Sequence, residues 1–129
     1  SVIEYAVKVL KVRHIIVCGH YQCGGVKAAM EGKAEGSVHQ WLTGVRALWN
    51  NHKERLQSLS PDHALTELCE LNVALQMTSV CKMDAIKQAW QSDQPLSVHG
   101  WIYAIEDGLL KDLGTTVSNE AEYAKLLTP

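Results

Sequence analysis

His20 and Cys23 are the two side chains of this sequence whose types and spacing best suit chemistry. An imidazole nitrogen and a thiolate sulfur are both ligands that zinc accepts, and a gap of two residues lets both reach one ion from a single loop. A lone His-x-x-Cys pair is a weak signal by itself, so the alternative is a buried cysteine and a loop histidine that bind no metal. The sequence around the pair therefore has to be considered before either interpretation is preferred.

An apolar run and three glycines surround the pair. Residues 15–18 are short, apolar and rich in branched side chains, which favours a buried strand of a parallel sheet. Gly19, Gly24 and Gly25 permit a turn, and residues 26–30 are typical of the first turns of a helix. Ligands of open α/β sheets bind at the carboxyl ends of strands, and a helix N-terminus favours a thiolate. This context favours a metal half-site.

The sequence of residues 14–26, HIIVCGHYQCGGV, resembles the second zinc motif of the β-class carbonic anhydrases. Four further blocks follow that family's order and spacing: residues 1–7 (SVIEYAV), 69–73 (CELNV), 99–103 (HGWIY) and 107–114 (DGLLKDLG). The resemblance therefore covers nearly the whole chain, and it is greatest to the bacterial branch of the family.

The resemblance implies zinc-dependent, reversible hydration of carbon dioxide to bicarbonate and a proton, with His20 and Cys23 as two of the zinc ligands. It also implies a bicarbonate-binding role for Tyr103, and the glycine-rich helix start suggests that backbone amides near Gly24 help to place the substrate oxygens. The family's first motif, Cys-x-Asp-x-Arg, does not occur between Ser1 and Pro129. Because that motif provides another zinc cysteine and the Asp/Arg pair, the catalytic residues of this chain stay unknown. We interpret the chain as the C-terminal portion of a longer β-carbonic anhydrase.

Two other functions stay open on the sequence alone. The chain could be a non-catalytic derivative that keeps the zinc-loop scaffold as an assembly module. It could also carry a redox or regulatory thiol at Cys23 without any metal. Measurements of zinc content and of carbon dioxide hydration would distinguish these two alternatives from a zinc enzyme.

Length, charge and cysteine content limit the kind of protein further. The 129 residues, of which 47% are hydrophobic, predict a single α/β domain over residues 1–129. A net charge of −2 predicts no nucleic-acid partner, and the lack of a long apolar run predicts no membrane partner. The four cysteines predict reduced thiols and a cytoplasmic protein, provided that no targeting segment precedes Ser1. Among them, Cys18 is expected to be buried structure, and the family resemblance implies a homodimer or homotetramer.

Helix signals occupy most of the rest of the chain. Ser1 with Glu4 predicts a capped helix through residue 11, and Asn119 with Glu122 predicts another through about residue 127. An apolar stripe along residues 38–49 predicts a helix that packs into the core or faces a second subunit. Further helices are expected from Pro61 and over residues 82–91.

The second strand is expected over residues 96–103, parallel to the first. Asp107 with Gly108 is typical of a two-residue hairpin, so residues 109–113 should return antiparallel. The predicted fold class is therefore α/β, with a parallel central sheet, an antiparallel edge hairpin and flanking helices. The first strand resembles an interior strand, which predicts a sheet that begins earlier in a longer chain.

Overall fold

The computed structural model describes residues 1–127, which form eight helices and three strands. The strands are β1 (His14–His20), β2 (Ser97–Ala104) and β3 (Leu109–Val117). The helices are α1 (Val2–Lys8), α2 (Gly24–Glu31), α3 (Gly36–Trp41), α4 (Thr43–Asn51), α5 (Lys53–Gln57), α6 (Pro61–Cys81), α7 (Asp84–Gln91) and α8 (Glu120–Leu127). Within the described residues, no helix combines the length and apolar character that crossing a membrane requires.

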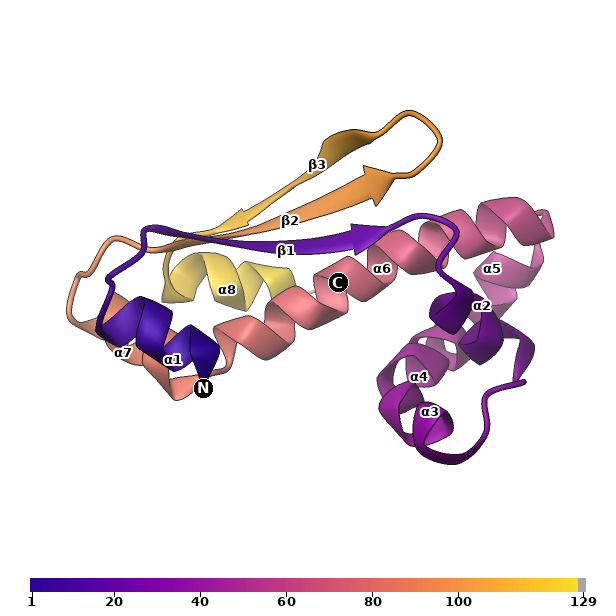
Figure 1. Cartoon of the computed structure of the whole chain (residues 1–129), viewed down its shortest axis with the longest axis horizontal. Coiled ribbons are helices and arrows are strands. Elements are labelled where there is room, and N and C mark those ends of the chain that lie inside the picture. The colour runs from indigo at the N-terminus through magenta and orange to yellow at the C-terminus, as the bar shows by residue number, and fades with distance from the viewer. Residues whose placement is uncertain (128–129) are drawn as a thin grey trace. The chain divides into compact units, whose positions relative to one another are not determined.

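The three strands form one mixed sheet in the order β1-β2-β3. β1 and β2 run parallel, and β3 returns antiparallel beside β2 (Figure 1). This confirms the predicted fold class. The hairpin differs in detail, because its connection spans residues 105–108 rather than two residues. Gly108 adopts a φ of 70° and donates its N–H to Ala104 O over 2.9 Å, while Asp107 Oδ1 accepts the Leu109 N–H over 3.0 Å.

The chain divides into two compact units. The first unit comprises Ser1–Cys18, Ala74–Trp101 and the part from Asp112 on. In this unit α1 packs against α7, and α1, α7 and α8 lie on one face of the sheet (Figure 1). The apolar side chains that are least exposed here are Val7, Met77, Cys81, Ile86, Val98 and Val117. Their removal from water is the main favourable contribution to this core.

Both predicted N-cap residues of the first unit accept a hydrogen bond from the backbone three residues later. The Glu4 N–H donates to Ser1 Oγ over 3.2 Å at the start of α1. At the start of α8, the Glu122 N–H donates to Asn119 Oδ1 over 2.8 Å, and Asn119 Nδ2 donates back to Glu122 Oε1 over 3.0 Å. The bonds from the Glu4 and Glu122 N–H groups satisfy donors that lack a partner within the helix.

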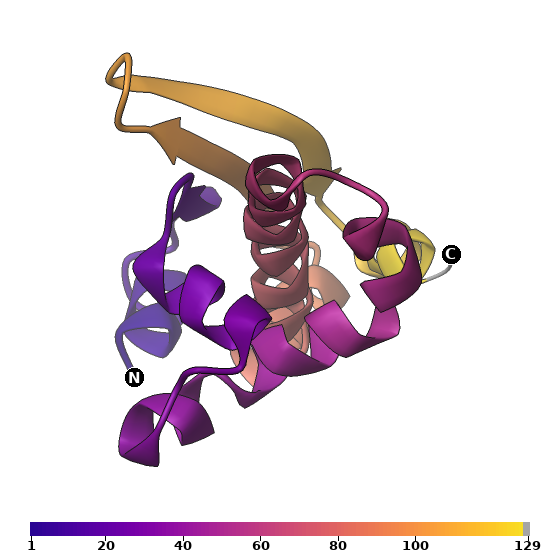
Figure 2. The same cartoon turned by 90° about the vertical axis from the view of Figure 1, so that its right-hand side faces the viewer.

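The second unit comprises Gly19–Val73 and Ile102–Lys111. It contains α2 to α5, which lie beside the N-terminal part of α6 (Figure 2). α2 packs against α4, and the buried side chains of these two helices include Val26, Ala29, Val45 and Trp49. Both predicted ligands belong to this unit.

The expected helix over residues 38–49 is broken into α3 and α4 at Leu42. Thr43 Oγ1 donates a hydrogen bond to Gln40 O over 2.9 Å. A side-chain hydroxyl therefore satisfies one of the last carbonyl groups of α3. The stripe is divided accordingly: Leu42 is buried, whereas Val38 is 51% and Trp41 81% exposed. The predicted packing of residues 38–49 into the core is therefore confirmed for only part of the apolar stripe.

The expectation that Cys18 is buried was wrong. Side chains of β1 alternate between an exposed set, which includes Ile16 and Cys18, and a partly buried set, which includes Ile15 and Val17. Successive side chains of a strand point to opposite faces, so helices on one face bury only every second residue. The apolar run was read as a strand covered on both faces, but residues 1–127 bury only one face of β1.

Candidate metal centre

The predicted ligands flank a very short connection. β1 ends at His20 and α2 begins at Gly24, so residues 21–23 form the whole link between strand and helix. Gln22 makes the turn with a φ of 58°, a left-handed conformation that is uncommon for a residue other than glycine. Cys23 is the N-cap residue of α2, with φ −69° and ψ 119°. The local sequence thus places an imidazole and a thiol within one turn, as predicted.

The imidazole of His20 is oriented by its own loop. Its Nδ1 lies 2.9 Å from Tyr21 O. A backbone carbonyl only accepts hydrogen bonds, so Nδ1 is the donor, and Nε2 is the ring nitrogen left for a metal. Metal-binding histidines generally donate their second ring N–H in this way, and the bond fixes both tautomer and ring orientation. The donor set of His20 Nε2 and Cys23 Sγ therefore fits zinc.

Tyr21, between the two predicted ligands, is held through both its backbone and its hydroxyl. Its backbone N–H donates to Tyr103 O over 3.0 Å, which joins the loop to the end of β2. Its hydroxyl donates to Glu70 Oε2 on α6 over 2.8 Å. Burial, followed by this bond to a carboxylate, raises the pKa of Tyr21 to about 12. The hydroxyl therefore stays protonated and keeps donating throughout the physiological pH range.

Two further residues of α6 support the loop. Cys69 is 3% exposed, and its thiol interacts with the backbone of Cys23 and Gln22. Burial raises the pKa of the Cys69 thiol, which favours the neutral form. Val73 is 2% exposed, and its Cγ2 lies 2.6 Å from the place that a Cβ on Gly19 would occupy. Gly19 is thus the residue that allows β1 and α6 to approach.

The two predicted substrate-binding residues lie in the same unit. Gly24 is the first residue of α2, and nothing in the described structure lies within 4 Å of the place where its Cβ would be. Tyr103 is 36% exposed near the end of β2, and its hydroxyl is 3.7 Å from the Cβ position of Gly108 at the hairpin connection. The backbone of Tyr103 therefore contacts residues 20–23, which we call the ligand loop, whereas its hydroxyl lies beside the hairpin.

Sequence reasoning did not identify Glu70, Cys69 and Val73 as parts of the site. Cys69 has no histidine at a ligand spacing beside it in the sequence, so no local motif indicates its contact with the loop. The block CELNV carried one available signal, since Glu70 places a charge beside the apolar positions of α6. No group of three or more His, Cys, Asp or Glu residues suited to a metal occurs within residues 1–127.

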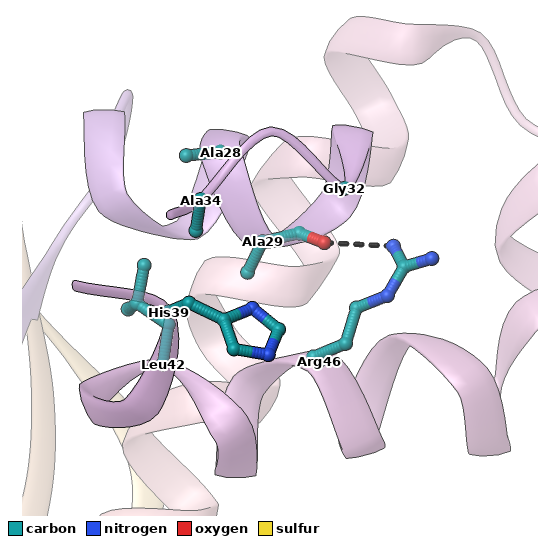
Figure 3. A pocket seen from close by; sticks show the side chains of 7 residues that line it. All are labelled: Ala28, Ala29, Gly32, Ala34, His39, Leu42 and Arg46. Carbon is teal, nitrogen blue, oxygen red and sulfur yellow. Dashed lines mark hydrogen bonds between the residues drawn. The ribbon is translucent and has the colours of Figure 1, made fainter. Parts of the chain in front are cut away.

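The cavity in Figure 3 does not include the ligand loop. It encloses about 250 Å³ between the C-terminal end of α2, the following loop and α3 and α4. Arg46 lies at its edge and donates Nη1 to Ala29 O over 2.8 Å and to Met30 O over 3.0 Å. The guanidinium thus satisfies the last carbonyls of α2, which a cation at a helix C-terminus stabilises. Stabilisation of the C-terminal end of α2 therefore accounts for the position of Arg46.

The fold and the loop define an α/β protein that carries His20 and Cys23 at a strand-to-helix turn. The family model described as "Carbonic anhydrase" matches residues 1–110. This chain belongs to the carbonic anhydrase family, and its solved structural relatives place it in the β class.

Relatives and solved structures agree with this assignment. The carbonic anhydrase of Emericella nidulans is 43% identical over 114 residues, covering 88% of this chain and 50% of that protein. A carbonic anhydrase of Pseudomonas aeruginosa is 33% identical, over 86% of this chain and 51% of that protein. The Coccomyxa β-carbonic anhydrase structure superposes with a TM-score of 0.88 and 38% identity, over 98% of this chain and 58% of that chain. The chain spans about half the length of the curated relatives that it matches.

Proposed function

We propose that this chain is part of a zinc-dependent enzyme that reversibly hydrates carbon dioxide to bicarbonate and a proton. The observation that carries the proposal is the ligand loop, in which the bond from His20 Nδ1 to the Tyr21 carbonyl leaves Nε2 available and Cys23 follows three residues later as the N-cap of α2. Family membership supports the reaction class, because the relatives at 43% and 33% identity are named carbonic anhydrases. The remaining zinc ligand and the Asp/Arg pair come from outside these 129 residues.

The residues of this chain have separable tasks in the proposed reaction. His20 and Cys23 would hold zinc, and bound zinc supplies the Lewis acidity that makes water nucleophilic near neutral pH. The Tyr21 carbonyl holds the proton of His20 Nδ1 and so keeps Nε2 as a ligand. The open space beside Gly24 allows substrate oxygens to approach the first N–H groups of α2, which favour negative charge.

Zinc quantitation and stopped-flow carbon dioxide hydration test the proposal on the protein encoded by the complete coding sequence. We expect about one zinc per chain, and loss of both zinc and activity in His20→Ala and Cys23→Ser. His39→Ala and Cys18→Ser are matched controls, because His39 lies on α3 and Cys18 lies on β1 outside the turn. Zinc without activity would support the assembly module, and full activity in the two ligand variants would refute the proposal.

We also propose a homodimer or homotetramer. A structural relative from Sordaria macrospora with 34% identity and a TM-score of 0.83 is described as tetrameric. Trp41 supports an interface on α3, because a side chain that is 81% exposed leaves much apolar surface in water. Light scattering after size-exclusion chromatography should give a multiple of the chain mass, and Trp41→Lys should shift it towards the monomer. A monomeric native protein would contradict this proposal.

A further inference from the structure

The ligand loop is connected to α6 by a hydrogen bond between residues far apart in sequence. The Tyr21 hydroxyl donates to Glu70 Oε2 over 2.8 Å, across a separation of 49 residues. A hydrogen bond to a charged group is stronger than one between neutral groups, and partial burial protects it from competition by water.

Tyr21 is placed where it affects both ligands. Its carbonyl holds the His20 ring through the 2.9 Å contact with Nδ1. Its backbone N–H is bound to Tyr103 O, so the peptides on both sides of Tyr21 are fixed by hydrogen bonds. Gln22 then turns the chain through its positive φ towards Cys23, whose backbone interacts with the Cys69 thiol. A movement of Tyr21 would therefore displace the imidazole and the thiol together.

We propose that Glu70 is a positioning residue that acts through the Tyr21 hydroxyl to hold His20 and Cys23 in the arrangement that binds metal. The inference rests on the proposed function, because it requires these two residues to be zinc ligands. Glu70 itself does not bind the ion: its contribution is to restrict the loop before the metal arrives. Such restriction lowers the conformational entropy that is lost on binding.

The alternative is that the bond only stabilises the fold. Glu67 offers a matched comparison, because it lies one helical turn before Glu70 on α6 and pairs with Arg55 instead of the loop. Removing the Glu67 carboxylate should affect stability without reaching the ligands. Glu70→Gln offers a rescue, since its amide oxygen can still accept the Tyr21 hydroxyl proton.

The test measures Zn²⁺ affinity by chelator competition in the protein from the complete coding sequence. We expect Tyr21→Phe and Glu70→Ala each to weaken affinity about 10-fold, in the range for residues that orient metal ligands. The double variant should lose about 10-fold rather than about 100-fold, because both changes remove one bond. Glu70→Gln and Glu67→Ala should bind within about 3-fold of the native protein.

A second readout separates positioning from simple stability. The absorption bands of the Co²⁺-substituted protein report coordination geometry, and they should broaden or shift in Tyr21→Phe but not in Glu67→Ala. Urea denaturation checks that each variant is folded at the assay temperature. Native affinity and native Co²⁺ bands in both Tyr21→Phe and Glu70→Ala would overturn the inference alone. A native protein whose zinc content does not depend on His20 and Cys23 would overturn the proposed function as well.

Discussion

Gly19 is the position at which the structure makes its sharpest steric prediction. A Cβ built there would lie 2.6 Å from Val73 Cγ2 and 4.0 Å from Cys69 O. Carbon atoms in contact prefer about 3.5–4.0 Å, so Gly19→Ala is too close by roughly 1 Å. Val73 is 2% exposed and branched at Cβ, and it lies within a helix, so it cannot rotate away cheaply. The strand end or the helix must move.

The expected cost follows from known effects of overpacking. An added methyl group in a packed site destabilises a protein by about 1–3 kcal/mol, and we expect Gly19→Ala to fall in this range. Val73→Ala alone should cost about 1–3 kcal/mol, because it removes two buried methyl groups and leaves a cavity. In the double variant the new methyl occupies the space that Val73 vacated. Its destabilisation should therefore be smaller than the sum of the single changes by at least about 1 kcal/mol.

Urea denaturation at equilibrium measures all four proteins of this cycle, with the slope m checked for constancy. Gly25→Ala is a matched control, since its Cβ would meet Leu42 at an ordinary 3.6 Å. Gly19→Ala should also weaken zinc binding, because the displaced strand end carries His20. Additive single changes, or a Gly19→Ala protein as stable as the native one, would show that the close approach of β1 and α6 is not real.

Other predictions follow from burial and from the open space beside α2. Gly24→Ala should leave the free energy of unfolding unchanged or raise it by up to about 1 kcal/mol, because the space that the methyl group would enter is open. The same methyl group should reduce carbon dioxide hydration, because it would occupy the space proposed for the substrate. Native activity in this variant would contradict a role for Gly24 in substrate binding. In the folded protein, Cys18 should react with a disulfide reagent well before Cys69 and Cys81, which are 3% and 0% exposed. Burial raises the pKa of Cys81 from 9.0 to about 11, so between pH 9 and 11 the unfolded state loses a proton that the native state keeps. The free energy of unfolding should therefore fall with pH in this window, and fall less in Cys81→Ala; parallel curves would contradict this.

Several elements could be predicted because their signals are local. The apolar run before Gly19 predicts the strand, and the glycines after it predict the turn and the start of α2. Ser1 and Asn119 each form the predicted cap, because a capping box needs only residues three apart. The same locality explains why His20 and Cys23 share one turn.

Predictions failed where the outcome depends on competing or distant groups. At the break at Leu42, Thr43 Oγ1 donates to a carbonyl of the preceding turn, a local competition that an apolar stripe does not reveal. Cys18 is exposed because covering layers decide which faces of a strand are buried, and the composition of the strand does not specify those layers.

The sequence by itself determined the strand-to-helix turn that carries His20 and Cys23, and the family, because both depend on residue types at short or ordered spacings. Only the tertiary structure decided what holds the turn. Glu70 reaches Tyr21 across 49 residues, and Val73 meets Gly19 across a comparable stretch of chain. The periodicity of a helix shows which residues share a face, but the partner of that face is chosen by the packing of the whole chain. That packing holds the loop on which the two proposed ligands lie.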